Sequence, residues 1–513
     1  MRKFIFLIAM LSLSQAIANQ EFLVKMNQAT TLEKMQSLYG KENVTDLRFN
    51  NWVKVAVSSE RAVSSLSSRA DFVEPNKQFK IQLHRPQREG GGGFIGGDAG
   101  GGFIGGGDAG GGGSSGGFIG GGDAGGGFIG GDAGGGSSGG FIGGDAGGGS
   151  TNGGGTSGGS TSGGSTSGGA SKGDPDFPTS IPTTSGPDID YAKQWGMADI
   201  GVREAWQAAV TKGSPDMIVA VIDSGVDYTH EDIMENTWRN PGESGNGKEN
   251  NGVDDDNNGF IDDVVGWDFA TNDNKPYDIT GGFMGNPGHG THCAGNVAAR
   301  SDNGKGIVGV APNVKIMAMR FITEKGSGST DAAVQAIKYA VDNGAKVLSN
   351  SWGSEGDDGG AESQALQEAI QYAQDKGVLF VAAAGNSSYN NDTPGKASVP
   401  ASYPHDNIIS VAAIDRNNAL ASFSSYGLTT VDIGAPGVDV YSSIPKNKYM
   451  NMPGTSMACP HVAGAAALYW SHNPQATMMQ VKEAIMKSAV PVSGLKGKVV
   501  TGGKLNVKNL ITQ

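Results

Sequence analysis

The sequence predicts an α/β protein of three layers, in which a mostly parallel sheet is covered by helices on both faces. Five strand-like runs are expected, and two of them, Met217 to Ile222 and Gly377 to Ala384, show no polar alternation, as expected for strands that are buried on both faces. Helical segments separate several of these runs, and strands that alternate with helices form parallel sheets. The expected strands are Met217 to Ile222, residues 314–321, residues 345–351, Gly377 to Ala384 and residues 408–413; the expected helices are residues 330–343, 362–376 and 477–487, and a helix from Ser456 to about Trp470.

This domain is expected to span residues 174–513. Its strands and helices alternate from Asp188 onward, and these roughly 325 residues suffice for one large core. The chain carries a net charge of −13, and most of the acidic excess falls in this domain. An acidic domain argues against nucleic acid as a partner. We expect a monomer. The chain has two cysteines, Cys293 and Cys459, and the sequence leaves open whether they are free or bridged.

The first 18 residues are predicted to be a signal peptide. Arg2 and Lys3 precede an apolar run that ends at Leu13, and Ala16-Ile17-Ala18 fits the small-residue rule for cleavage. The protein is therefore expected to be exported, to the periplasm or the medium. The run is too short to span a bilayer, and no other segment approaches about 20 apolar residues, so no membrane span is expected.

Residues 19–87 are predicted to form a small ferredoxin-like α+β domain. Glu21 to Met26 and Trp52 to Val57 alternate as strands do, residues 31–39 and 60–68 have helical periodicity, and Asp71 to Asn76 closes with another strand. A further strand is expected at residues 44–49. The resulting order of strands and helices favours the ferredoxin-like arrangement.

Residues 88–173 are predicted to be a disordered glycine-rich linker. Most of the 86 glycines lie here, and Phe-Ile-Gly-Gly recurs at Phe94, Phe103, Phe118, Phe128 and Phe141. Such a composition cannot form a packed core. Two other interpretations stay open: the Asp-Ala-Gly repeats bind a metal, or the Phe-Ile pairs tether the protein to a partner or to the cell surface.

Three segments place candidate catalytic side chains at the ends of strands or the starts of helices. Asp223 ends a buried strand, and the carboxyl ends of strands are where α/β proteins build their sites. His289 opens a helix of small residues. Ser456 starts another, where free N–H groups stabilise a negative charge. A serine nucleophile needs a base, and the base needs an orienting acid.

The strings V-I-D-S-G-V-D, H-G-T-H-C-A-G and G-T-S-M-A-C-P-H-V-A-G around these residues resemble the three signatures of subtilisin-like serine proteases, and the resemblance covers about residues 188–513. Their order, Asp then His then Ser, is the order in subtilisin. The resemblance implies a secreted serine endopeptidase that hydrolyses peptide bonds of polypeptide substrates through an acyl-enzyme. It also implies that Asn386, which follows a buried strand, donates its amide to the oxyanion.

Phe-Val-Glu-Pro-Asn at residues 72–76 resembles the inhibitory propeptide of this family. The implied protein is an autoprocessed zymogen whose own propeptide acts as an intramolecular inhibitor. Substrate is expected to add as a strand between two backbone edges, and Ser398 is expected at the floor of the specificity pocket. The small residues predict a preference for medium or large apolar side chains before the scissile bond. The edges are Ser351, Trp352 and Gly353, and Ala383, Ala384 and Gly385.

An Asp-rich loop predicts a calcium site, because it matches the front half of an EF-hand loop. The expected side-chain ligands are Asp254, Asp256, Asn258 and Asp262, with the carbonyl of Phe260; Asp263 would replace the missing glutamate at Val265. A solvated acidic loop is the alternative. The family resemblance implies a second calcium site at Asp188, Asp232 and Asn303, with Asp190 close to the first of these.

Two other functions remain to be weighed. A sedolisin-like peptidase shares the serine motif but uses a glutamate base, and the histidine in H-G-T-H argues against it. A binding or structural protein, in which the glycine repeats act and the protease fold is vestigial, belongs to a different class.

Overall fold

The structure is a computed structural model that describes residues 20–67, 69–81, 175–178, 184–281, 285–355 and 362–513. The predicted signal peptide, almost all of the predicted linker and the segment that joins the linker to residue 81 lie outside the described residues. The described residues all belong to one compact unit, which comprises residues 1–92 and 168–513.

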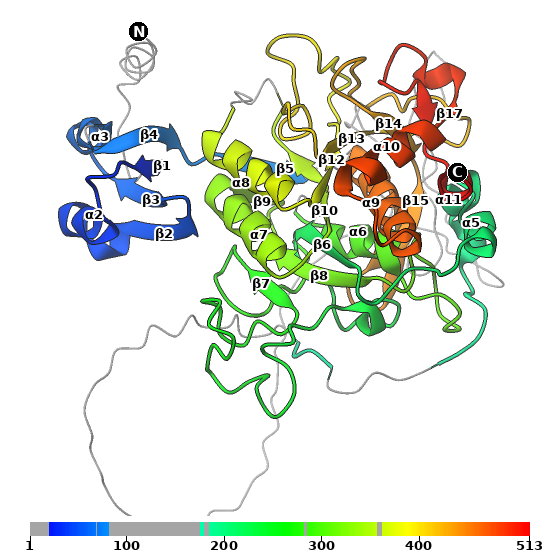
Figure 1. The fold of residues 1–513 in the computed structure, drawn as a ribbon, viewed down its shortest axis with the longest axis horizontal. Helices are drawn as coiled ribbons and strands as arrows, with labels where there is room; N and C mark the ends of the chain where they lie inside the picture. Colours follow the sequence, from blue (N-terminus) through cyan, green and yellow to red (C-terminus); the bar gives the residue numbers. More distant parts are fainter. Residues whose placement is uncertain (1–19, 68, 82–174, 179–183, 282–284, 356–361) are drawn as a thin grey trace, which may run out of the picture. The chain divides into compact units, whose positions relative to one another are not determined.

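A mostly parallel sheet of nine strands forms the centre of the large domain (Figure 1). Neighbouring strands of this sheet pair in parallel, except β17 with β18, which are antiparallel. In spatial order the strands are β17 (Val490–Pro491), β18 (Gly503–Lys504), β14 (Ile433–Pro436), β13 (Ile408–Ile414), β12 (Leu379–Ala383), β10 (Val347–Asn350), β6 (Ile218–Asp223), β8 (Lys315–Arg320) and β7 (Gly266–Asp268).

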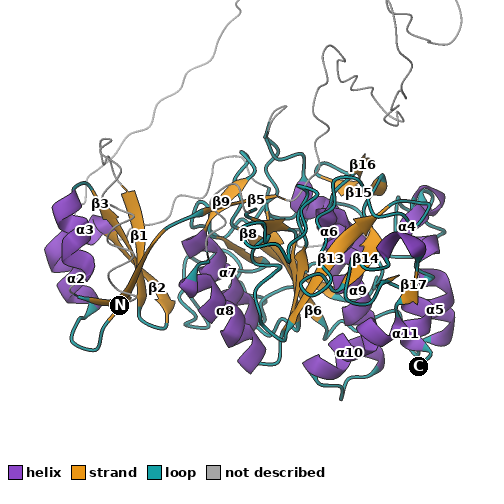
Figure 2. Cartoon of the chain, turned by 90° about the horizontal axis from the view of Figure 1, so that it is seen from above, coloured by secondary structure: helices purple, strands orange, loops and turns teal. Residues whose placement is uncertain are grey.

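Helices cover both faces of this sheet (Figure 2). The side chains of β6, β8, β10 and β12 alternate between two cores. In β6, Val219 and Val221 belong to one core, and Ala220 and Ile222 to the other. The three-layer α/β/α prediction is therefore confirmed. The helices are α4 (Trp195–Asp199), α5 (Val202–Ala208), α6 (His289–Ala298), α7 (Thr330–Asp342), α8 (Gln364–Asp375), α9 (Thr455–His472), α10 (Met478–Ser488) and α11 (Val507–Ile511).

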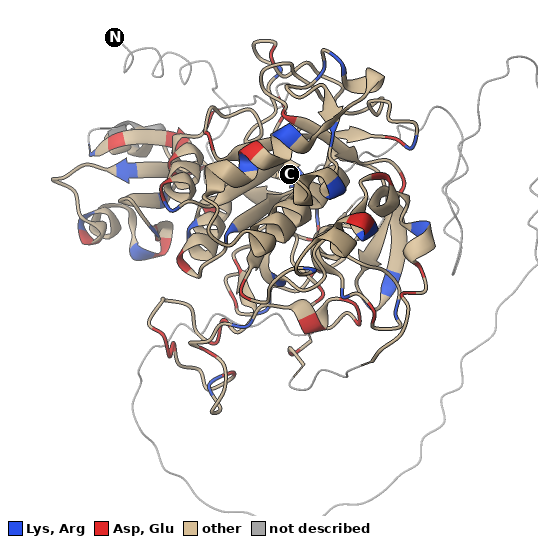
Figure 3. Ribbon diagram, turned by 45° about the vertical axis from the view of Figure 1, so that its right-hand side comes forward, with Lys and Arg blue, Asp and Glu red and all other residues tan. Residues whose placement is uncertain are grey.

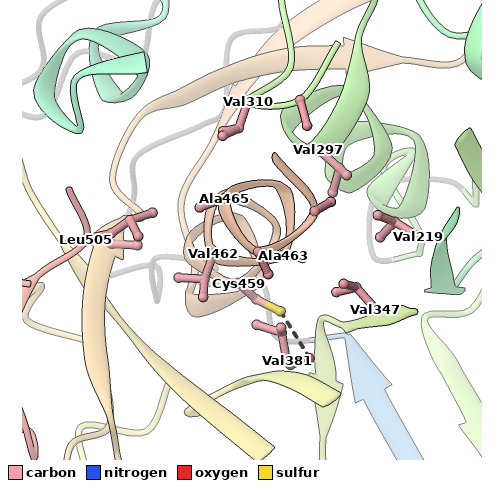
Figure 4. Close-up of a cluster of buried hydrophobic side chains, with 14 of the residues drawn as sticks. Val219, Val297, Val310, Val347, Val381, Cys459, Val462, Ala463, Ala465 and Leu505 are labelled. Carbon is pink, nitrogen blue, oxygen red and sulfur yellow. Dashed lines mark hydrogen bonds between the residues drawn. The ribbon is translucent and has the colours of Figure 1, made fainter. Parts of the chain in front are cut away.

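The uncharged helix α9 lies in the middle of the first core (Figure 4). Val462, Ala463 and Ala465 of α9 pack among Val297 of α6 and valines of the sheet. Because α9 is apolar or small all round, it is buried over most of its length. Figure 3 marks the acidic and basic residues along the ribbon, and α9 contains none of them.

The N-terminal segment forms a four-stranded antiparallel sheet with the order β2-β3-β1-β4. Its elements are β1 (Gln20–Met26), α2 (Leu32–Tyr39), β2 (Val44–Phe49), β3 (Trp52–Val57), α3 (Glu60–Ser67) and β4 (Ala70–Pro75). This order supports the ferredoxin-like prediction.

Short strands outside the central sheet were not predicted. β5 (Gln78–Ile81) lies between β9 (Ser327–Ser329) and β11 (Trp352–Gly353) in an antiparallel three-stranded sheet. A hairpin joins β15 (Val440–Ile444) to β16 (Lys448–Met452). β5 is the end of the described N-terminal segment, so this segment contributes a strand to the large domain.

Candidate active site

The strand β6 and the helix α6 bring Asp223 and His289 together. Asp223 is the last residue of β6 and His289 the first of α6; both are fully buried. The imidazole Nδ1 lies 2.7 Å from Asp223 Oδ1. A carboxylate can only accept, so the proton sits on Nδ1 and Nε2 keeps a lone pair. Nε2 is buried and has no hydrogen-bond partner among the described residues.

Ser456 lies in the first turn of α9, where the helix leaves backbone N–H groups free. Its hydroxyl donates to the carbonyl of Ser351 at 2.8 Å, and not to His289. The two predicted partners are thus not hydrogen-bonded to each other. Catalytic hydrogen bonds are often absent or long before substrate binds.

The carbonyl of Ser456 is held by side chains because of Pro460. A proline at this position cannot donate the helical hydrogen bond to residue 456. The hydroxyl of Ser351 at 2.9 Å and the thiol of Cys293 at 3.5 Å contact this carbonyl instead. These contacts fix the backbone of the serine.

Asn386 lies just beyond β12 and is oriented by Thr455. Its Oδ1 accepts from the backbone N–H and from the hydroxyl of Thr455, both at 3.0 Å. Only an oxygen can accept the backbone N–H, so the amide NH₂ points the other way. That Nδ2 is buried and unpartnered within the described structure. The four predicted residues therefore present one unpaired imidazole nitrogen and one unpaired amide donor.

A buried carboxylate that the sequence did not reveal ties β6 to α6. Asp278 accepts from the hydroxyl of Ser224 at 2.9 Å, from the amide of Asn286 at 2.6 Å and from the backbone N–H of Thr291 at 2.8 Å. Burial raises the pKa of Asp278 to about 6. Asp278 lies in a loop without a motif, so only the fold could bring it to this place.

Comparisons with known proteins agree with this geometry. The model of the Subtilase family matches residues 214–509, more than half of the chain. The chain belongs to the subtilase family. It is 39% identical to a thermophilic serine proteinase of Bacillus sp. strain AK1 over 319 residues. These residues are 62% of this chain and 67% of that protein. It is 38% identical over 315 residues to thermitase of Thermoactinomyces vulgaris, over 61% of this chain and 94% of thermitase.

A third relative, subtilisin DY of Bacillus licheniformis, is 45% identical over 202 residues, which are 39% of this chain and 70% of that protein. The subtilase is thus a serine endopeptidase of the subtilisin-like type, as the sequence predicted. Membership in this family counts against the sedolisin-like alternative.

The two cysteines of the subtilase are free and fully buried. Burial raises the pKa of both thiols, that of Cys459 to about 12. The thiol of Cys459 donates to the carbonyl of Val381 at 3.4 Å. Thiols with raised pKa values are poor nucleophiles, so both cysteines act as small packing residues.

The two predicted substrate edges lie beside Ser456. The carbonyl of Ser351 accepts a hydrogen bond from the hydroxyl of Ser456. Trp352 and Gly353 form β11, which pairs with β5. Ala383 ends β12, Ala384 follows it, and the N–H of Gly385 donates to Thr455 Oγ1 at 3.2 Å. The first edge is therefore already occupied by an extended segment of the same chain.

The Asp-rich loop gathers three carboxylates, one of which the sequence missed. Ligand oxygens of Glu243, Asp254 and Asp256 all lie within 4.8 Å of one another. Glu243 is buried; its Oε1 accepts from the backbone of Asp255 and Asp256, and its Oε2 has no partner in the described part of the chain. The signal in the sequence is weak, because Glu243 precedes the motif by 11 residues.

The other predicted ligands of this loop have different partners. Asp262 accepts from the backbone of Asn251 and Gly252, away from the cluster of three. Asn258 donates to Asp256 and Asp263, and its Oδ1 accepts from the backbone N–H of Phe260. The hydroxyl of Tyr339 donates to Asp263, and burial raises the pKa of Asp263 to about 7.

The residues of the second predicted calcium site are neighbours in the structure. Asp232 accepts from the amide of Asn303 at 2.9 Å, and the backbone N–H of Asn303 points to Asp188 at 3.4 Å. Asp190 instead pairs with Lys193 at 2.9 Å, so Asp188 is the better candidate. Burial raises the pKa of Asp188 and of Asp232.

None of the helices in the described part of the chain has the length and apolar character of a membrane span.

Proposed function

We propose that this subtilase cleaves polypeptides with Ser456 as nucleophile, His289 as base, Asp223 as its orienting acid and Asn386 as oxyanion donor. One observation carries the proposal. Among the described residues, Nε2 of His289 has no partner beside the Asp223–His289 hydrogen bond, and Nδ2 of Asn386 has none beside the contact of its oxygen with Thr455. Unsatisfied buried groups are rare and need a reason. Substrate would supply the missing partners.

The reaction follows from these positions. The hydroxyl of Ser456 turns from the carbonyl of Ser351 to Nε2 of His289, gives up its proton and attacks the peptide carbonyl. The negative charge on the former carbonyl oxygen is stabilised by Nδ2 of Asn386 and by the N–H of Ser456. His289 then protonates the leaving amine, and water hydrolyses the acyl-enzyme by the same route. Asp223 stabilises the imidazolium in both steps.

The same chain is proposed to be an exported zymogen, inhibited by residues 19–87. β5 supports this proposal because it pairs with β11 and β9, so it occupies the edge at which a substrate strand would add. Phe79 of β5 is fully buried, and its ring lies 5.2 Å from that of Trp352 in an edge-to-face contact.

The rest of the N-terminal domain is held by polar contacts with α7 and α8. Glu74 is buried and accepts from the hydroxyl of Ser363 and from the backbone of Gln364 and Ala365, the free N–H groups at the start of α8. Lys54 pairs with Asp331 in the first turn of α7 at 2.9 Å. Release of this domain would free the edge for substrate.

Calcium is proposed to bind the Asp-rich loop through Glu243, Asp254 and Asp256, and the Asp188, Asp232 and Asn303 group as a second site. The residues fit a hard cation: they offer only oxygen donors, and Glu243 has a buried oxygen without a partner. When bound, calcium would neutralise these carboxylates and stabilise the fold by mass action. It takes no part in the chemical steps.

Labelling with a fluorophosphonate tests the proposed chemistry. The wild-type protein should be labelled at Ser456, and Ser456→Ala should not. Asn386→Asp keeps the acceptor for Thr455 but removes the donor, so the protein should fold and hydrolyse a peptide substrate on the order of 10²- to 10³-fold more slowly, the cost known for such a donor in subtilisin. Absence of labelling in folded, self-processed protein would refute the assignment of Ser456.

A further inference from the structure

We propose that Glu355 gives the specificity pocket of this subtilase a negative charge, so that it selects substrates with Lys or Arg before the scissile bond. The inference rests on the proposed function, because it places the pocket between the two substrate edges beside Ser456. It replaces the apolar preference that the small residues of these edges predicted.

A backbone bridge brings Glu355 to the pocket. Ser354 and Val399 exchange two antiparallel hydrogen bonds, of 2.9 Å and 3.0 Å. In such a pair the next residue of one segment faces the preceding residue of the other. Glu355 therefore comes opposite Ser398, the residue that the sequence placed at the pocket floor.

Both side chains lie against Gly385, the end of the second substrate edge. A Cβ built on Gly385 would lie 2.9 Å from Oε1 of Glu355 and 3.1 Å from Oγ of Ser398. The same Oε1 accepts from the backbone N–H of Asn386 at 2.6 Å. The carboxylate thus accepts a hydrogen bond from the backbone of the residue whose side chain is the proposed oxyanion donor.

The surroundings offer polar groups and bare backbone. Gly353 and Gly385 have no side chain, and the ring of Trp352 packs against Phe79 and Phe321. Oγ of Ser398 is buried and has no hydrogen-bond partner in the part of the chain that the structure describes. Among the described residues, the polar side-chain groups nearest to Gly385 are therefore a carboxylate and a hydroxyl, both of which accept hydrogen bonds.

These acceptors favour a cationic side chain over an apolar one. A carboxylate has about four lone-pair sites, so Glu355 can accept from Asn386 and from a substrate ammonium or guanidinium together. An apolar side chain would instead remove water from the carboxylate without replacing its hydrogen bonds, which costs free energy.

Two peptide substrates test the inference on the purified active protein. They are identical except for lysine or norleucine before the scissile bond; the two side chains share the same unbranched carbon chain, and only lysine carries a terminal ammonium. The wild type should show a kcat/KM at least about tenfold higher for lysine, the size expected for a hydrogen bond to a charged group. Glu355→Gln keeps the acceptor for Asn386 and should lower the lysine to norleucine ratio about tenfold, through the lysine peptide.

Asp375→Asn is the matched control, because Asp375 is an exposed carboxylate at the end of α8, and it should keep the wild-type ratio. In the wild type, 1 M salt should also lower the ratio, because Glu355 is only half-buried and its charge can be screened. Equal or faster cleavage of the norleucine peptide by the wild type, or an unchanged ratio in Glu355→Gln, overturns the inference while peptide hydrolysis persists. Loss of both peptide cleavage and fluorophosphonate labelling in wild type overturns the proposed function, and this inference with it.

Discussion

At the scale of single residues, two histidines near the proposed catalytic groups are buried as neutral rings. Nδ1 of His461 donates to the carbonyl of Met457 at 2.7 Å, and Nε2 of His292 lies 3.0 Å from the carbonyl of Val440. Burial lowers the pKa of His461 to about 4 and that of His292 to about 3, from an ordinary value of 6.5. Each of these two rings is therefore protonated more fully in the unfolded chain than in the folded chain below pH 6.5.

We predict that these two rings lower the free energy of unfolding as the pH drops from 7 to 5, opposite in sign to Asp263 and Asp278, whose pKa values burial raises. The loss from the rings begins near pH 6.5, the pKa of histidine in the unfolded chain, and continues toward the folded values. At pH 5 each ring would contribute on the order of 2 kcal/mol. Urea unfolding of Ser456→Ala, which cannot digest itself, measures the net change between pH 7 and 5, and adding His461→Gln should make that change more favourable by about 2 kcal/mol. An equal change in both proteins would refute this role of His461.

The residues that the sequence identified share one property. Asp223, His289, Ser456 and Asn386 each lie at the end of a strand or the start of a helix, where a local motif specifies both the residue and its place. Other residues of the site come from loops whose meeting depends on the whole fold. Glu243, Asp278 and Glu355 have no local pattern, so sequence reasoning could not find them.

At the scale of elements, apolar runs predicted the central strands because burial on both faces leaves a pattern that is independent of neighbours. β6, β8, β10, β12 and β13 follow the predicted runs within a few residues. β9 has the sequence Ser-Gly-Ser and no apolar pattern at all. It is a strand because β5 pairs with it, and such a pairing cannot be read from three residues.

β5 carries the prediction that belongs to this scale. In full-length Ser456→Ala, Phe79→Ala should loosen β5, because truncation of a buried phenylalanine costs about 3–5 kcal/mol. The amide of Thr330, which donates to Lys77 at 2.9 Å, and the amides of β9 and β11 should then exchange hydrogen at least tenfold faster. Lys80→Ala changes an exposed residue of the same strand and should leave exchange unchanged. Unaltered exchange in Phe79→Ala would show that Phe79 does not hold the strand in place.

At the scale of the whole molecule, the two cysteines form no disulfide with each other. Metal binding is then a candidate source of added stability. Carboxylates whose pKa burial raises occur at both proposed calcium sites, Glu243 and Asp263 at the Asp-rich loop and Asp188 and Asp232 at the second. A cation at either place would offset the cost of burying these charges only in the folded state. Stability should therefore depend on calcium concentration.

We predict that chelation with EGTA lowers the Tm of Ser456→Ala protein. Calcium at 100 times its Kd adds about 2.7 kcal/mol per site, and each kcal/mol corresponds to about 2–4 °C in a domain of 150–250 residues. Glu243→Gln should remove the part of the calcium-dependent increase in Tm that comes from the Asp-rich loop. The part that comes from the second site should remain. Glu249→Gln is the control, because Glu249 accepts from the backbone of Gly245 and is not part of the cluster. If calcium raises the Tm of Glu243→Gln as much as that of its parent, Glu243 is not a ligand; calorimetric titration of both proteins with calcium would then show the same number of sites.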